Sequence, residues 1–224
     1  MTVYIGGEDF VTKEIAKRLI KFCMADTEIE FEDLTFRAHG TRALETLNVM
    51  LNFAKKYPVV AVFDSDGNCI IELLEKYTAD KRNADYAAIN FAVDEAEAWL
   101  MADREGLAKY FRISVDEIPD KKSDDSEISN SIPYKTSLYI LTEIAPLSKA
   151  ALIREALAFE KPGKKPSTYN SIWGKYIDEI WNISAACENS ESLKRTIKRI
   201  KKMLAAKGML KRNLFLTAGN IPSE

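Results

Sequence analysis

The sequence predicts an α/β fold, in which a mostly parallel β-sheet is flanked by helices and is followed by an α-helical C-terminal half. Three observations support this prediction. Short β-rich runs alternate with stretches of helical periodicity through the first hundred residues. The run VVAVF at 59–63 is continuously apolar, which is typical of a central parallel strand covered on both faces. Helical patterns dominate from Glu95 onward, so we expect an α/β core at 1–112 and a helical region at 113–224 packed on it.

The elements of the first half follow from local patterns. In the stretch at 11–25, Ile15, Leu19, Ile20 and Cys23 are spaced as on one face of a helix. Strands that alternate with helices in this way are joined by crossovers, and neighbouring strands then run parallel. The expected strands span 2–5, 28–36, 59–63 and 86–93, and the expected helices span 11–25, 42–56 and 70–77.

The second half is predicted to consist of helices joined by polar loops. The loop at 116–133 is acidic and Pro-bracketed, and the loop at 160–170 is rich in Lys and Pro. Trp99, Trp173 and Trp181 lie in helical patterns and are expected in the core. The expected helices span about 134–145, 148–159, 169–181 and 190–206, and one further strand is expected at 213–218.

Composition limits the class of protein. The 224 residues are 46% hydrophobic and 29% charged, which is typical of a soluble globular protein and excludes a disordered chain. The formal net charge of -2 produces no field over the whole protein, so a nucleic-acid-binding surface must be local. The three cysteines form no CxxC pair, the first residues do not resemble a signal peptide, and no apolar run reaches the roughly 20 residues that span a bilayer. We therefore expect a cytoplasmic protein without a membrane segment.

Acidic residues follow three of the four expected strands. Ligands and catalytic groups of open parallel sheets gather outside the carboxyl ends of the strands, so we expect these acids along one edge. His39 is the only histidine, which leaves carboxylates as the groups that would carry any chemistry. The acids are Glu8 and Asp9 after the first strand, Asp64 and Asp66 after the third, and Asp94, Glu95 and Glu97 after the fourth.

Carboxylates gathered at one edge repel one another unless a cation neutralises them. Mg²⁺ (or Mn²⁺) suits such a site, because Mg²⁺ prefers oxygen ligands, uses one or two protein carboxylates and keeps positions for water and phosphate. Taken singly, Asp64 or Asp94 could instead cap the helix that follows. A DxD after an apolar strand, together with a Glu after the first strand, favours a metal site for phosphoryl transfer.

The segments VYIGGED (3–9) and VVAVFDSDG (59–67) resemble the two signatures of the Toprim fold, a Glu after the first strand and a DxD after the third. The Gly pair precedes Glu8 here, whereas the usual signature places the Glu before a Gly. Nearly the whole chain resembles an uncharacterised bacterial Toprim-like family, which is related to the nuclease domain of overcoming-lysogenization-defect proteins. The other matching segments are INFAVDEAEAWLMADREGLAKYF (89–111), PYKTSLY (133–139), STYNSIWGKYIDEIW (167–181) and ACENSESLKRTIKRI (186–200).

This resemblance implies a Toprim-like core and a Mg²⁺-dependent nuclease subunit that cuts DNA or RNA. Members of the family are often encoded beside an ATPase in phage-defence cassettes, which implies an ATPase partner and antiviral defence, and a homo-oligomer is a further expectation. By the same resemblance, Asp64 and Asp66 would hold the metal. Glu8 would act as general acid or base, or would join the coordination.

Glu95, Glu97 and Asp103 would form or support a second metal position, again by the resemblance. In one continuous helix, Glu95 and Glu97 would lie about 200° apart around the axis. They can face the same cleft only if a helix begins between them, so on geometric grounds Glu97 is the weaker candidate.

The stretch at 192–212 contains nine Lys or Arg and no acid. On a helix, Leu193, Ile197, Ile200 and Leu204 would form a buried stripe and leave the cations in solvent. A solvated face normally mixes both signs, so contact with phosphate or an acidic partner is the alternative to a plain surface helix.

Further lysines lie in the loop at 161–166 and in the segments that resemble the family. The residues expected to contact nucleic acid are Lys135, Lys175, Lys194, Arg195, Lys198 and Arg199.

Two other functions compete with the nuclease. The string FDSDGN resembles the nucleophile motif of haloacid dehalogenase-type phosphatases, in which the first Asp attacks phosphorus. That motif normally lies on the first strand and has Thr or Val after the Gly, whereas here it follows the third strand and Asn68 comes next. In the second alternative the chain is a non-catalytic binding subunit, in which the acids cap helices and the basic helix docks the ATPase.

Overall fold

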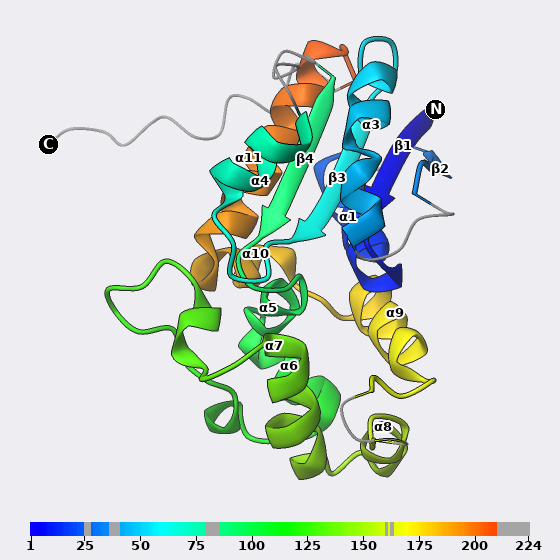
Figure 1. Ribbon diagram of the computed structural model, residues 1–224. Helices are drawn as coiled ribbons and strands as arrows, with labels where there is room; N and C mark the ends of the chain where they lie inside the picture. The colour runs from blue at the N-terminus through cyan, green and yellow to red at the C-terminus, as the bar shows by residue number, and fades with distance from the viewer. Residues whose placement is uncertain (25–27, 36–40, 79–85, 160, 162–163, 210–224) are drawn as a thin grey trace, which may run out of the picture.

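The centre of the protein is a four-stranded sheet in which every pair of neighbouring strands is parallel (Figure 1). The strand order is β2-β1-β3-β4, which confirms the predicted α/β class and parallel sheet. The strands are β1 (Thr2–Gly7), β2 (Glu30–Asp33), β3 (Val59–Asp64) and β4 (Ala87–Ala92). This computed structural model describes residues 1–24, 28–35, 41–78, 86–159, 161 and 164–209, so His39 and the strand expected at 213–218 lie outside the described residues.

The helices fall into two groups along the chain. The first group connects the strands: α1 (Phe10–Cys23), α2 (Thr41–Glu45), α3 (Leu47–Phe53) and α4 (Ile70–Thr78). The second group follows β4: α5 (Glu97–Met101), α6 (Arg104–Phe111), α7 (Thr136–Tyr139), α8 (Ala151–Ala156), α9 (Tyr169–Glu179), α10 (Ile183–Asn189) and α11 (Glu191–Ala206). Short 3-10 turns lie at Val115–Glu117, Ile128–Ser131 and Ala145–Leu147, and a π-helical turn lies at Ile140–Ile144.

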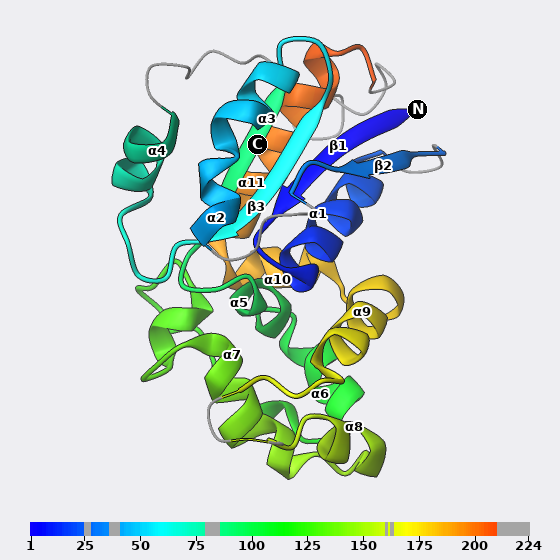
Figure 2. The same cartoon turned by 45° about the vertical axis from the view of Figure 1, so that its right-hand side comes forward.

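Alternating side chains along β3 belong to two different hydrophobic clusters, one on each face of the sheet. Val60 and Val62 join the cluster that includes α1 and α11. Val59, Ala61 and Phe63 join the cluster formed with α2, α3 and α4. Figures 1 and 2 show these two helical layers on opposite faces. Coverage on both faces is the physical reason that residues 59–63 are continuously apolar.

Several helices differ from the expected bounds. The helix expected at 42–56 is divided into α2 and α3 at Thr46, whose hydroxyl donates to the carbonyl of Ala43 at 2.6 Å and so competes with the helical hydrogen bonds. The helix expected at 134–145 is α7 followed by the π-helical turn, and α8 is shorter than 148–159. Helix α10 was not predicted; the Asn182 side chain caps it by accepting a hydrogen bond from Ala185 N.

One hydrophobic cluster joins the two halves of the chain. Trp99, Trp173 and Trp181 are all buried in it, as predicted. Helix α11 buries the predicted stripe of Leu193, Ile197, Ile200 and Leu204 against α1 and β4. Among the described residues, no helix is long and apolar enough to cross a membrane.

Candidate active site at the carboxyl edge of the sheet

The strands β1, β3 and β4 end side by side, at the edge that faces α5, α7 and α9 (Figures 1 and 2). Gly7, the last residue of β1, allows α1 to begin close to the strand, because a Cβ at this position would lie 2.5 Å from Thr12 Oγ1. Asp9 caps α1 through a reciprocal pair of hydrogen bonds with Thr12. Glu8, between Gly7 and Asp9, is thereby held at the edge.

Glu8 and Asp64 are in direct contact. The backbone N–H of Asp64 donates to Glu8 Oε1 at 2.9 Å. Burial raises the pKa of Glu8 to about 6, against the opposing effect of that hydrogen bond and with support from the charge of Asp66. Burial also raises the pKa of Asp64 well above its usual value, and the charges of Glu97 and Glu8 raise it further. The structure therefore brings the acids of strands β1 and β3 together, as predicted.

Asp66 lies in a tight turn beside this pair. Its backbone is left-handed, with φ of 50°, and its N–H donates to the carbonyl of Asp94 at 3.0 Å. Asp tolerates this conformation better than most residues do. The Asp66 carboxylate is exposed, and Lys135 Nζ lies 2.6 Å from its Oδ1. That hydrogen bond is the main cause of a raised pKa at Lys135.

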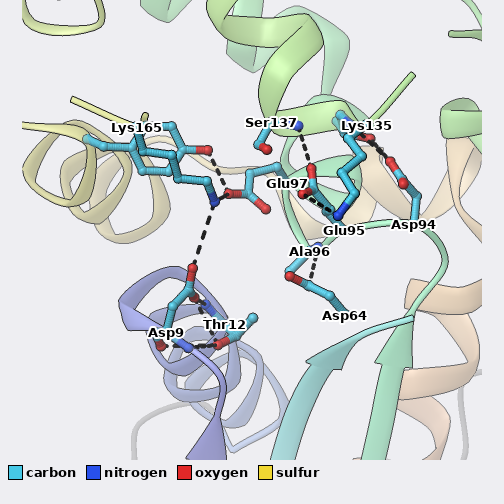
Figure 3. Close-up of polar contacts among 12 residues, drawn as sticks. Asp9, Thr12, Asp64, Asp94, Glu95, Ala96, Glu97, Lys135, Ser137 and Lys165 are labelled. Atoms are coloured by element: carbon cyan, nitrogen blue, oxygen red, sulfur yellow. Dashed lines mark hydrogen bonds and ion pairs between the residues drawn. The ribbon is translucent and has the colours of Figure 1, made fainter. Parts of the chain in front are cut away.

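The acids after β4 bind the start of α7. Asp94 Oδ2 accepts hydrogen bonds from the backbone N–H of Thr136 at 2.9 Å and from its hydroxyl at 2.6 Å. The N–H of Ser137 donates to Glu95 Oε2 at 2.7 Å, and burial followed by the charge of Glu97 raises the pKa of Glu95. Asp94 and Glu95 therefore fix the backbone of the segment that carries Lys135 (Figure 3).

Glu97 is buried and is held by two side chains from a distant part of the chain (Figure 3). Lys165 Nζ donates to Glu97 Oε1 at 2.9 Å, and the Tyr169 hydroxyl donates to the same oxygen at 2.6 Å. Lys165 also lies 3.9 Å from Asp9 Oδ2. Burial acts to lower the pKa of Lys165, but the charge and hydrogen bond of Glu97, together with the charges of Asp9 and Glu95, outweigh it and the net shift is upward.

Helix α5 begins at Glu97, with Ala96 as its N-cap. Glu95 therefore precedes the helix, and the condition under which both acids can approach the edge is met. The sequence pattern indicates a lysine-rich loop at 161–166 but does not single out Lys165, and it predicts no role for Tyr169. The lysine-rich loop is a signal for Lys165, whereas nothing local to Tyr169 distinguishes it from a core tyrosine.

The donor set suits Mg²⁺ with two protein ligands. Among the described residues, no three His, Cys, Asp or Glu side chains form a group that could hold a metal ion. Glu8 and Asp64 nevertheless each have one carboxylate oxygen that could bind an ion, because no group of the described residues donates a hydrogen bond to Glu8 Oε2 or Asp64 Oδ2. Burial raises the pKa of both carboxyl groups, so both charged forms are costly and a bound cation would offset that cost. One or two carboxylates are the usual protein share of a Mg²⁺ site.

Asp103 has a different environment from the other predicted ligands. It is buried and caps α6, with Oδ1 accepting from Gly106 N at 3.1 Å. Its Oδ2 accepts from Asn182 N at 2.7 Å and from the Tyr176 hydroxyl at 3.1 Å. One oxygen thus caps α6 and the other joins α6 to the segments around α9 and α10, and a role for Asp103 at a second metal stays a prediction.

The predicted nucleic-acid contacts lie in three places. Lys135 is at the carboxylate edge. Lys175 lines a groove of about 960 Å³ between α6, α8 and α9, together with Lys109 and Arg112. The exposed cations of α11 form its solvent face and are Lys194, Arg195, Lys198, Arg199, Lys201 and Lys202.

Comparisons of this chain with protein-family models, with curated proteins and with solved structures found no match in any of the three. The Toprim-like resemblance therefore stays a prediction.

Proposed function

We propose that the protein is a Mg²⁺-dependent nuclease whose active site is the carboxylate edge of the sheet. The observation that carries this proposal is the contact between Glu8 and Asp64, two acids from adjacent parallel strands with raised pKa values. Such a pair is costly without a cation, and groups perturbed in this way are concentrated at functional sites. The two acids also lie where open parallel sheets place their ligands.

Each residue of the site has a proposed role in phosphodiester hydrolysis. When bound, Mg²⁺ would polarise the scissile phosphate and lower the pKa of a water molecule. Glu8 and Asp64 would hold the ion. A carboxyl group with a pKa of about 6 is suited to exchange protons near neutral pH, so Glu8 is the candidate general acid or base whenever it does not bind the ion directly. Asp66 is the candidate third ligand.

The proposed substrate is a polynucleotide, DNA or RNA. Its support is the solvent face of α11, where six cations are exposed on a helix whose only acid is Glu191 at its first position. Lys194 pairs with Glu191 at 3.6 Å, and both side chains are exposed enough for solvent to weaken the pair. An ATPase partner, a role in antiviral defence and a cytoplasmic location belong to the same proposal and follow from the family resemblance.

The test is cleavage of single- and double-stranded DNA and RNA with Mg²⁺ or Mn²⁺, with and without the product of the neighbouring ATPase gene. We expect Asp64→Asn to reduce cleavage at least 10³-fold, on the order of the loss when a group that stabilises the transition state is removed. Asp33→Asn is the matched control. Asp33 ends β2 at the same edge but pairs with Lys13 at 2.8 Å, outside the cluster, so cleavage should persist.

The same experiment separates the competing functions. A phosphatase would hydrolyse p-nitrophenyl phosphate and form an aspartyl-phosphate, so beryllium fluoride trapped on Asp64 would favour it. A binding subunit would retain polynucleotide or ATPase binding, and neither wild type nor variants would cut any substrate. Either result would overturn the nuclease proposal.

A further inference from the structure

Two lysines from the helical half reach the carboxylate edge, and their surroundings differ. Lys165 pairs with Glu97, whose side chain is 1% exposed. Removing Lys165 would leave the buried carboxylate of Glu97 without its cation, which destabilises proteins. Lys135 pairs with Asp66, and the two side chains are 55% and 43% exposed. Exposed ion pairs contribute little to stability. Lys135 can therefore leave Asp66 for another partner at little cost, whereas Lys165 cannot leave Glu97.

Lys135 pairs with Asp66 in the turn beside Glu8 and Asp64. Its Nζ lies 2.6 Å from Asp66 Oδ1 and 4.0 Å from Glu95 Oε1, between acids that follow β3 and β4. Burial has the largest effect on the pKa of Glu8, and the charges of Asp66 and Lys135 modify it, so both groups lie near Glu8. With Asp66 held in this way, Glu8 and Asp64 are the two carboxylates left for an ion.

The backbone on either side of the pair is fixed, so exchange needs only side-chain movement. Thr136 and Ser137 are bound to Asp94 and Glu95, as described above. Asp66 is bound through its N–H to the Asp94 carbonyl. The long Lys135 side chain can therefore leave Asp66 while residues 136–137 keep their positions.

We infer that Lys135 is an exchangeable counter-ion of the metal site: it neutralises Asp66 in the metal-free protein and yields this carboxylate when a divalent cation binds. The inference rests on the proposed function, because it assumes that Glu8 and Asp64 bind the cation. Its consequence is that Lys135 opposes metal binding. A lysine that serves only to contact substrate phosphate would have no such effect on the metal alone.

The test is the affinity of the whole protein for Mn²⁺ alone, measured from the EPR signal of free Mn²⁺ with no nucleic acid present. Lys135→Met removes the ammonium and keeps an unbranched side chain that is one atom shorter. We expect it to tighten Mn²⁺ binding about three- to tenfold, as expected for loss of an exposed ion pair and a nearby positive charge. Lys149→Met is the matched control, since Lys149 is exposed and makes no ion pair with the described residues, and its affinity should equal that of wild type.

A second pair of variants tests whether Asp66 is the group exchanged. In an Asp66→Asn background, Lys135→Met should tighten Mn²⁺ binding less than it does in the wild-type background, because the competing pair no longer exists and only the effect of the nearby positive charge remains. Acetylation of lysines by an N-hydroxysuccinimide ester gives an independent readout. Mn²⁺ should raise the labelling rate of Lys135 at least twofold in wild type and leave that of Lys165 unchanged, because only Lys135 loses its partner.

The outcomes separate this inference from the proposed function. If wild type and Lys135→Met bind Mn²⁺ equally, or if the variant binds more weakly, Lys135 is not a competing counter-ion, although the metal site stands. If neither protein binds Mn²⁺, the metal site and the inference both fail. Equal labelling of Lys135 with and without Mn²⁺ would also overturn the exchange.

Discussion

At the scale of single residues, the edge of the sheet combines acids that are well compensated with acids that are not. Asp94 accepts two hydrogen bonds from Thr136, and Glu97 is held by a lysine and a tyrosine. Glu8 and Asp64 each accept one backbone hydrogen bond and repel one another. Residues that carry function often reduce stability in this way.

These carboxyl groups predict how stability depends on pH in the absence of metal. Burial is the main cause that raises the pKa of Glu8 from 4.5 to about 6, so the folded chain binds more protons and the free energy of unfolding falls as the pH rises through that interval. The loss from Glu8 is below about 2 kcal/mol, because solvent screens this partly exposed group. Asp64→Asn removes the repulsion and keeps the acceptor for Ala96 N, so we expect it to be about 1–2 kcal/mol more stable than wild type at pH 8 and closer to wild type at pH 5.

Urea unfolding in EDTA at both pH values measures this difference. Asp33→Asn is a control of opposite sign. Burial acts to raise the pKa of Asp33, but the hydrogen bonds from Lys13 and Thr35 together outweigh it and the net shift is downward, so this variant should lose stability at pH 8. Destabilisation by Asp64→Asn at pH 8 would contradict the idea that Glu8 and Asp64 lack a compensating cation.

At the scale of the element, α11 has two faces with separate tasks. Leu193, Ile197, Ile200 and Leu204 are buried against the sheet, and Ser190 caps the helix by accepting from Leu193 N. The cations of the opposite face contribute little to this packing. We expect that they can be changed without loss of the fold, so variants of this face test polynucleotide binding separately from stability.

We predict that replacing Lys194, Arg195, Lys198 and Arg199 with Gln weakens binding to all sequences alike. Each lost phosphate contact should flatten the slope of log affinity against log salt by about 0.7–0.9. Fluorescence anisotropy between 50 and 300 mM salt, roughly the range in which such contacts respond, measures the slope. The control variant replaces Lys55, Lys56, Lys121 and Lys122 with Gln. It removes the same number of positive charges elsewhere and should leave the slope unchanged.

If the α11 variant binds polynucleotides normally but no longer co-purifies with the partner ATPase, the helix is a docking surface. The path of the substrate would then lie nearer Lys135 and the loop at 161–166.

At the scale of the whole molecule, the boundary predicted at residue 112 does not divide the hydrophobic core. Helix α11 contacts β4 and α1, and α9 contacts α1. Trp99 in the first half donates to Ser192 at 2.8 Å, and Trp181 in the second donates to the carbonyl of Trp99 at 3.2 Å. The helical half therefore completes one face of the sheet.

We accordingly expect a fragment of residues 1–112 not to fold alone, because the surfaces of β4 and α1 that α11 covers would be exposed to water. The whole chain should unfold in one cooperative transition, and the fragment should show none in thermal circular dichroism and poor dispersion in its amide NMR spectrum. A fragment that unfolds cooperatively would show that the boundary near 112 separates two folding units.

The sequence alone predicted the features that depend on neighbours along the chain. The β-rich runs and helical periods identified the parallel sheet, the apolar stripe of α11 and the edge at which Glu8 and Asp64 meet. Periodicity and the order of elements along the chain can be read from neighbouring residues. Only the tertiary structure decided which cation compensates which acid. Lys135 and Asp66 are 69 residues apart, and Lys165 and Glu97 are 68 apart, so their pairing depends on how the helical half packs against the sheet. For the same reason, only the fold showed that Asp103 is committed to contacts with Asn182 and Tyr176, since burial and hydrogen bonding are decided by segments that no local pattern brings together.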